Sequence, residues 1–166
     1  MKKTLLIAVL AVFGLGVSNA QEAGIKIGVT AALPVGELDE WYTFGVGLDV
    51  SYLWEVGDGF LLGATTGYNH YFGEELDFGF GTVTEAVDFQ FIPLAASARY
   101  YISDGFFAGT DLGYALGIGD GAGSGFYYRP KVGYSLNSLG FHLSYGGVSI
   151  DGGSFSFLGV GIELGL

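Results

Sequence analysis

The chain of 166 residues contains no cysteine, and it is poor in proline, histidine and basic residues. Without cysteine there is no disulfide framework, no thiolate metal ligand, no cysteine nucleophile and no attachment point for a lipoprotein anchor. Charged residues make up 14% of the chain, against about 25% in a typical soluble domain. That leaves too little charge to cover an ordinary water-facing surface.

Glycine, by contrast, is abundant. It accounts for 31 of the 166 residues, whereas its usual share is about 7%. Because no Gly-X-Y period accompanies it and half of the residues are apolar, collagen and ordinary disorder are both excluded. Beyond residue 20 there is no apolar stretch of 18 residues, so a membrane-spanning helix is not expected there.

The first twenty residues have the pattern of a secretory signal peptide. Lys2 and Lys3 precede an apolar run over 5–17, and small residues at Ser18 and Ala20 suit a cleavage site after Ala20. A retained anchor helix is the alternative, but 13 apolar residues are too few to span a bilayer. Cleavage leaves four basic and 17 acidic side chains, a net charge of −13, which makes nucleic acid an unfavourable partner.

From residue 24 onward, bulky apolar residues alternate with small or polar ones. Between 42 and 54, for example, Phe, Val, Leu and Tyr occupy every second position, with Gly, Thr, Asp and Ser between them. The connections between such segments alternate between long and short, which is typical of an up-and-down membrane barrel. The pattern predicts eight strands, at about 24–33, 42–54, 59–69, 87–101, 105–118, 126–136, 140–148 and 155–166.

The orientation of the two phases separates a membrane barrel from a soluble one. The bulky phase carries more volume than an eight-stranded barrel can enclose, and the other phase would make a poorly charged outer surface. We therefore predict an all-β, eight-stranded antiparallel up-and-down transmembrane β-barrel over 21–166, with its bulky phase toward lipid. Outward aromatics should form two girdles, one of Tyr42, Tyr68, Phe126 and Tyr128, the other of Tyr52, Trp54, Phe60, Tyr100, Phe106, Tyr134 and Phe141. The alternative is an ordinary sandwich core.

All four basic residues beyond the signal peptide fall in the inward phase. Three acidic residues share that phase, so we expect ion pairs in the interior. Closure of the first strand on the last should bring Lys26 near Glu163. A second cluster is expected at mid-barrel, consisting of Asp49, Arg99, Asp111, Arg129 and Lys131. The network is interpreted as a structural plug, and a gated conduit that rearranges these pairs is the alternative.

Several segments are similar to the small outer-membrane β-barrel proteins of the porin family, and to the OmpA transmembrane domain. They are 91–94 leading to 99–101, 125–134, 151–155 and 158–159. The resemblance implies a bacterial outer-membrane location, contact with lipid and lipopolysaccharide, and insertion by the barrel-assembly machinery. Gly161, Leu164 and Leu166 fit the spacing of the assembly signal, although the last residue is Leu rather than an aromatic. Phe155 and Phe157 would point inward by parity, which predicts a bulge or a shifted register there.

Catalysis and cofactors are not expected. His142 and Ser144 resemble the His-x-Ser of outer-membrane lipid A deacylases, but the asparagine that follows in those enzymes is Tyr145 here, and the position of the acid is Ser156. His70 and His142, the only histidines, should lie at opposite ends of the barrel, which disfavours a histidine metal site.

The longest connection, 70–85, combines acidic residues with Tyr71, Phe72, Phe78 and Phe80. It is interpreted as a hairpin that extends the neighbouring strands, with adhesion as the alternative. Divalent cations that bridge lipopolysaccharide are a further alternative for the loop acids Glu37, Asp39, Glu40, Glu74, Glu75 and Asp77. The sequence thus predicts a monomeric outer-membrane protein with a structural or surface-interaction role, and narrow channel, adhesin and lipid-modifying enzyme as alternatives.

Overall fold

The computed structural model describes residues 23–36, 41–77, 83–85, 87–119, 122–150 and 152–166. The predicted signal peptide and its cleavage site after Ala20 lie outside the described residues. Within the part of the chain that is described, no helix is long and apolar enough to cross a membrane.

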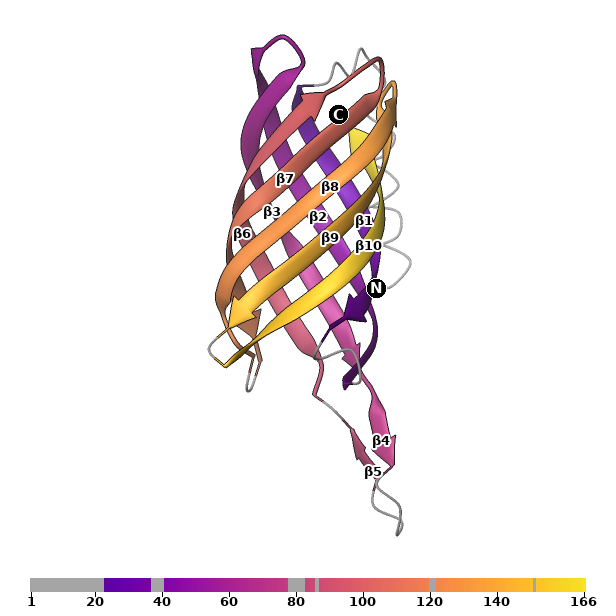
Figure 1. The fold of residues 1–166 in the computed structure, drawn as a ribbon, viewed down its shortest axis with the longest axis vertical. Coiled ribbons are helices and arrows are strands. Elements are labelled where there is room, and N and C mark those ends of the chain that lie inside the picture. Colours follow the sequence, from indigo (N-terminus) through magenta and orange to yellow (C-terminus); the bar gives the residue numbers. More distant parts are fainter. Residues whose placement is uncertain (1–22, 37–40, 78–82, 86, 120–121, 151) are drawn as a thin grey trace, which may run out of the picture.

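Eight antiparallel strands close into a barrel, as the alternation predicts (Figure 1). Around the barrel each strand pairs with its neighbours in the order β1-β10-β9-β8-β7-β6-β3-β2, and β1 pairs with both β2 and β10. Closure leaves no open sheet edge in the barrel. The strands are β1 (Gly24–Val35), β2 (Tyr42–Gly57), β3 (Phe60–Gly73), β6 (Phe89–Tyr101), β7 (Phe106–Ile118), β8 (Gly125–Leu136), β9 (Leu139–Ile150) and β10 (Gly153–Gly165).

The connections divide the barrel into two unlike ends. One, which we call the turn end, holds three short connections, 58–59, 102–105 and 137–138. The other, the loop end, holds the connection between β3 and β6, where β4 (Glu75–Asp77) pairs with β5 (Val83–Glu85). This hairpin projects beyond the barrel wall (Figure 1). Phe78 and Phe80 lie outside the described residues.

β3 continues to Gly73, so the first four residues of the predicted 70–85 connection extend the barrel wall, as the hairpin interpretation predicts. Tyr71 is buried inside the barrel, and Phe72 packs outside against Phe44 with ring centroids 4.6 Å apart. Tyr71 and Phe72 are thus residues of the wall and do not belong to the exposed loop aromatics on which the adhesion alternative depends. The strand extends because Tyr71 pairs with Gly45 on one side and with Phe89 on the other.

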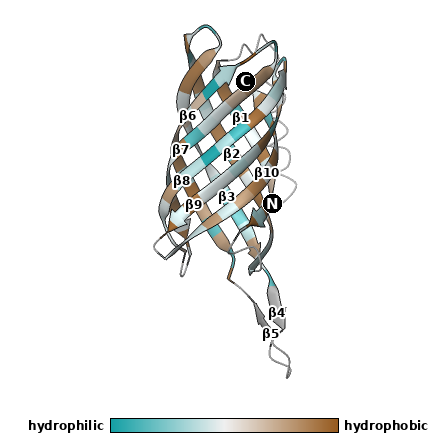
Figure 2. Ribbon diagram, in the orientation of Figure 1, coloured by the Kyte–Doolittle hydropathy of each residue, from teal (hydrophilic) through white to brown (hydrophobic). Residues whose placement is uncertain are grey.

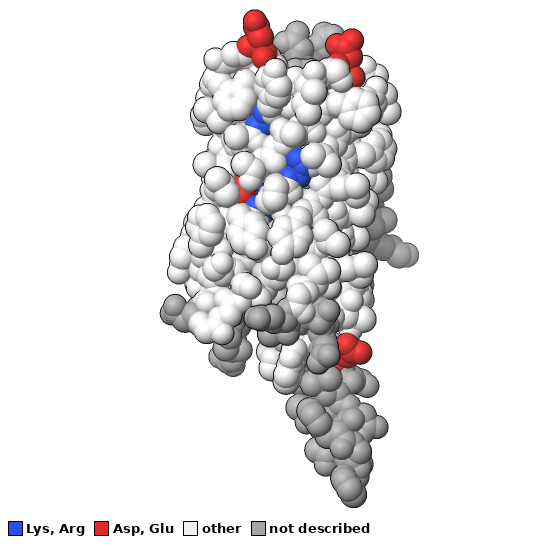
Figure 3. Space-filling view, viewed as in Figure 1, with Lys and Arg blue, Asp and Glu red and all other residues white. Residues whose placement is uncertain are grey.

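Most bulky apolar side chains face outward, and the inward phase holds the charged side chains, many small ones and a limited number of large apolar ones. Figure 2 shows apolar and polar positions alternating along the strands. In Figure 3 acidic residues protrude near the two ends, and at mid-height Lys, Arg and acidic atoms are visible only in gaps between the uncharged side chains of the wall. Such an outer surface suits hydrocarbon and not water. Large exposed apolar residues of the wall include Val29, Leu33, Leu48, Val50, Leu94, Leu112, Val132, Leu143, Leu158, Val160 and Ile162.

One predicted girdle residue, Tyr42, is wrongly placed by strict alternation. The pairing of β2 with β3 shifts between Tyr42 and Gly45. This irregularity changes the parity of the strand end, because a β-bulge reverses which face a residue takes. Tyr42 consequently packs on Phe155, an interior residue, with ring centroids 5.4 Å apart.

The bulge or shifted register predicted near Phe155 and Phe157 is also wrong. β10 pairs with β9 residue by residue from Gly153 to Leu164, and both phenylalanines point inward with 1% of their surface exposed. Glycine provides the space: a Cβ on Gly146 would stand 2.2 Å from the ring of Phe157. A narrow barrel thus holds bulky rings inside where the neighbouring strand offers no side chain.

Candidate functional site

The interior of the barrel is layered. A charged layer lies in the middle, and an apolar cluster lies on either side of it. The cluster toward the loop end consists of Ala32, Tyr71, Phe89, Phe91, Ala115, Tyr127, Val148, Phe155 and Phe157, and the cluster toward the turn end consists of Leu53, Leu61, Tyr101 and Phe107. We call them the loop-end cluster and the turn-end cluster.

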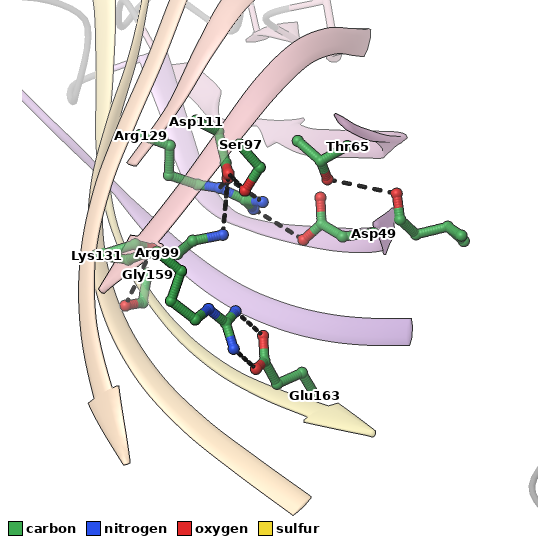
Figure 4. A network of polar contacts seen from close by, with 11 residues as sticks. Asp49, Thr65, Ser97, Arg99, Asp111, Arg129, Lys131, Gly159 and Glu163 are labelled. Atoms are coloured by element: carbon green, nitrogen blue, oxygen red, sulfur yellow. Dashed lines mark hydrogen bonds and ion pairs between the residues drawn. The ribbon is translucent and has the colours of Figure 1, made fainter. Parts of the chain in front are cut away.

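Arg129 of β8 joins two carboxylates across the charged layer (Figure 4). Its Nε donates to Asp111 Oδ2 at 2.9 Å, and its Nη1 donates to Asp49 Oδ2 at 2.8 Å. Lys131 Nζ donates to both oxygens of Asp111, at 3.1 and 2.9 Å, and Ser97 Oγ donates to Asp111 Oδ1 at 2.6 Å. One buried carboxylate therefore holds β6, β7 and β8 in register.

Arg99 of β6 forms a separate pair with Glu163 of β10. Its Nη1 donates to Oε1, and its Nη2 donates to Oε2 at 2.8 Å, so the pair is bidentate (Figure 4). The guanidinium carbon also lies 4.0 Å from the ring centroid of Phe107, a cation–π contact. The sequence had grouped Arg99 with Asp49 and Asp111, but here it pairs with Glu163 because β6 and β10 face each other across the interior.

The structure places all seven of the charged residues singled out by parity inside the barrel. Each has at most 7% of its surface exposed. Among the described residues, the buried set contains four basic and three acidic side chains: Lys26, Arg99, Arg129 and Lys131 with Asp49, Asp111 and Glu163. Buried charges are tolerated only when they are paired and hydrogen-bonded, and this arrangement supplies those partners.

His142 and Ser144 do not form a nucleophile–base pair in the described structure. Ser144 Oγ contacts the carbonyl oxygen of Gly159 at 3.5 Å, and neither ring nitrogen of His142 has a hydrogen-bond partner among the described residues. Nucleophilic catalysis needs a base within hydrogen-bond reach of the serine and an acid that orients the base.

A chain of polar contacts on the outer face of the wall, at the base of the hairpin, was not predicted from the sequence. Tyr68 Oη donates to Gln90 Oε1 at 2.8 Å and lies 3.1 Å from His70 Nδ1. His70 Nε2 lies 2.9 Å from Asp88 Oδ2, and the Gly73 amide donates to Asp88 Oδ1 at 2.9 Å. The Gly73 hydrogen bond, with a further contribution from His70, lowers the pKa of Asp88 below its ordinary value. The chain joins β3 to β6 where the hairpin leaves the barrel.

No cation site is assembled by the described loop acids. Within the described ranges, no group of three His, Cys, Asp or Glu side chains lies close enough to hold a metal ion. Glu37, Asp39 and Glu40 lie outside the described residues, and for Glu75 and Asp77 only the backbone is described.

The two interior clusters were missed as well, although a signal for them was present. Leu53 and Phe107 share the inward parity of the charged residue on their own strands, and Leu61 shares the parity of the buried polar residues of β3. The prediction from sequence treated the inward phase as a row of small side chains with a few charged ones. Parity alone would have placed these large side chains in the interior, but only the pairing of the strands shows that they contact one another.

Comparison with known proteins places the fold. No protein-family model matches the chain, and no curated protein matches it. Among solved structures, the chain is similar to the Yersinia pestis outer membrane protein Ail in a phospholipid bilayer nanodisc, with a TM-score of 0.56, 16% identity, and coverage of 86% of this chain and 100% of that one. It is similar to de novo designed transmembrane β-barrels, with a TM-score of 0.55, 12% identity, and coverage of 88% and 98%. Neisserial surface protein A gives a TM-score of 0.50 at 14% identity, with coverage of 86% and 96%. The fold is that of the eight-stranded outer-membrane β-barrels.

Proposed function

We propose that this protein is an integral outer-membrane barrel of a bacterium, exported by its N-terminal signal peptide, with a closed interior and a structural or surface-interaction role. The observation that carries the proposal is the inverted distribution of side chains. Aliphatic residues cover the wall, while the basic residues lie inside it. That arrangement is favourable in hydrocarbon, where a lysine or arginine at mid-depth on the lipid face costs about 2–4 kcal/mol.

A closed interior is supported by the two apolar clusters. A solute that reached the charged layer from the loop end would have to displace rings such as Phe91 and Tyr127, which are fully buried. From the turn end it would meet Leu53 and Phe107. An eight-stranded barrel is just wide enough for side chains to fill, so this packing argues for a plug and against the gated conduit.

Conductance tests the closed interior. Protein reconstituted into planar bilayers should show no steady conductance above the bare membrane. Arg129→Ala and Lys131→Ala should show none either, because both apolar clusters remain. Stepwise conductance of the unmodified protein would overturn the closed interior, whereas conductance of the variants alone would favour a conduit held shut by the ion pairs.

Membrane insertion is tested separately by heat-modifiable migration. A folded barrel in the outer-membrane fraction should migrate differently on SDS gels before and after boiling. Recovery of the protein only from the soluble fraction would contradict the membrane proposal whatever the conductance.

Surface interaction is the second candidate role, favoured by the hairpin that projects from the loop end (Figure 1). Ail, one of the structural neighbours, is named for attachment and invasion. Deletion of residues 75–85 should reduce attachment of expressing cells to host cells or matrix while heat-modifiable migration is kept. Unchanged attachment would remove this role and leave the structural one.

A further inference from the structure

Within the charged layer lies a small polar cavity. Its volume is about 10 Å³, measured as the space open to the centre of a water molecule. The side chains around it carry both signs of charge. They include Lys26, Lys131, Asp49, Glu163 and His142, and Gly28 also lines the cavity.

Two of these residues present polar atoms that have no hydrogen-bond partner among the described residues. They are both ring nitrogens of His142, a side chain from a residue that is 5% exposed, and Oδ1 of Asp49. A buried polar group without a partner costs about 1–3 kcal/mol, and native proteins hold few of them. Two such groups at one cavity indicate a shared ligand.

We propose that this cavity is a binding site for a single water molecule that completes the charged layer. A water molecule donates two hydrogen bonds, here to Asp49 Oδ1 and to the unprotonated ring nitrogen of His142, and it accepts one from a lysine ammonium group of the lining. The mixed lining of ammonium and carboxylate groups favours neither a bound cation nor a bound anion. The size agrees, because a water site needs about 10–15 Å³ on this measure and two to four polar partners.

Glycine shapes this site on two strands. A Cβ on Gly161 would stand 2.4 Å from His142 Nε2, so the absence of a side chain there lets the imidazole lie against β10. A Cβ on Gly28 would meet its nearest neighbour, the Ile162 carbonyl oxygen, at an ordinary 3.5 Å. Alanine at position 28 therefore fits sterically and takes up space that the water would use.

The direct test is nuclear magnetic resonance of the folded barrel in detergent micelles, with the ring signals of His142 assigned by their loss in His142→Phe. The His142 ring should show a cross peak to water with the sign of a long-lived bound molecule. The methyl group of Ala115, a fully buried residue of the loop-end cluster, should show none and serves as the internal control. Absence of the His142 cross peak would overturn the proposal.

Gly28→Ala then separates bound water from the exchanging lysine and hydroxyl protons nearby, because this variant retains all of those groups. We expect it to lose the water cross peak and to lower the urea midpoint of unfolding. The matched control is Gly57→Ala, at a position where a Cβ meets nothing within 4 Å, which should leave both unchanged or raise the midpoint slightly. A cross peak that survives in Gly28→Ala, or a midpoint raised as by filling a dry void, would overturn the site.

Discussion

Arg99 and Glu163 face each other across the interior and join two strands that are not neighbours in the barrel wall. Their two parallel hydrogen bonds connect β6 with β10, the strand that closes the barrel against β1. A single ion pair thus links the middle of the chain to its closing strand. Both side chains are buried, so neither can exchange its partner for water without opening the barrel.

Replacement of Glu163 by glutamine should destabilise the barrel by about 3–5 kcal/mol, because it leaves the buried Arg99 guanidinium without a counter-charge. Urea unfolding of the protein in detergent micelles measures the change. Glu55→Gln, at an exposed position of β2, is the control and should change stability by less than about 0.5 kcal/mol. Equal changes in the free energy of unfolding for the two substitutions would mean that the ion pair does not stabilise the barrel.

Gly133→Ala should cost about 1–3 kcal/mol through overpacking of the turn-end cluster. A Cβ at this position would stand 2.3 Å from the Phe141 carbonyl oxygen and 2.4 Å from the ring of Phe107. The backbone atom cannot rotate away, so the strands must separate. Gly153→Ala, where a Cβ meets nothing within 4 Å, is the control. The unfolding midpoints of both variants give the comparison, and a neutral Gly133→Ala would contradict the tight packing.

The contacts of Asp88 should be lost in acid. Its pKa is lowered in the folded protein, mainly by the Gly73 amide, so the carboxylate contributes stability above the usual Asp value of about 3.9. That contribution disappears as the pH falls through the lowered value. The Gly73 amide resonance should therefore shift with a midpoint below about 3.9. Asp88→Asn should abolish the titration, and a midpoint at or above the usual value would argue against this contact.

We expect that this protein does not modify lipid A in the membrane. Nucleophilic hydrolysis requires a base that activates the serine, and Ser144 contacts the Gly159 carbonyl oxygen instead of His142. Mass spectrometry of lipid A from cells with and without the protein should give identical acylation. Loss of an acyl chain that is reversed by Ser144→Ala would overturn the non-enzymatic interpretation.

The candidate site was predictable to the extent that it depends on strand parity. Lys131 and Asp111 lie on the consecutive strands β8 and β7 and share the inward phase, and parity holds wherever the pairing is regular. It failed at Tyr42, where the pairing of β2 with β3 shifts. It placed Arg99 in the interior but did not identify its partner, which is decided by which strands face each other across the barrel. The polar chain of Tyr68, His70 and Asp88 had no sequence signal, because it joins residues on two strands at a rim.

Local sequence alone determined the strands, the outward apolar phase and the inward position of every lysine and arginine beyond residue 20. Successive side chains of a strand point to opposite faces, so a short stretch of sequence is enough to assign each residue to a face. Tertiary structure decided which inward side chains meet. Parity directs Phe157 inward, but it fits there because Gly146 lies beside it, and Arg129 reaches Asp49 because the closed barrel brings β8 opposite β2. Closure is a property of all eight strands together, and no local window of sequence contains it.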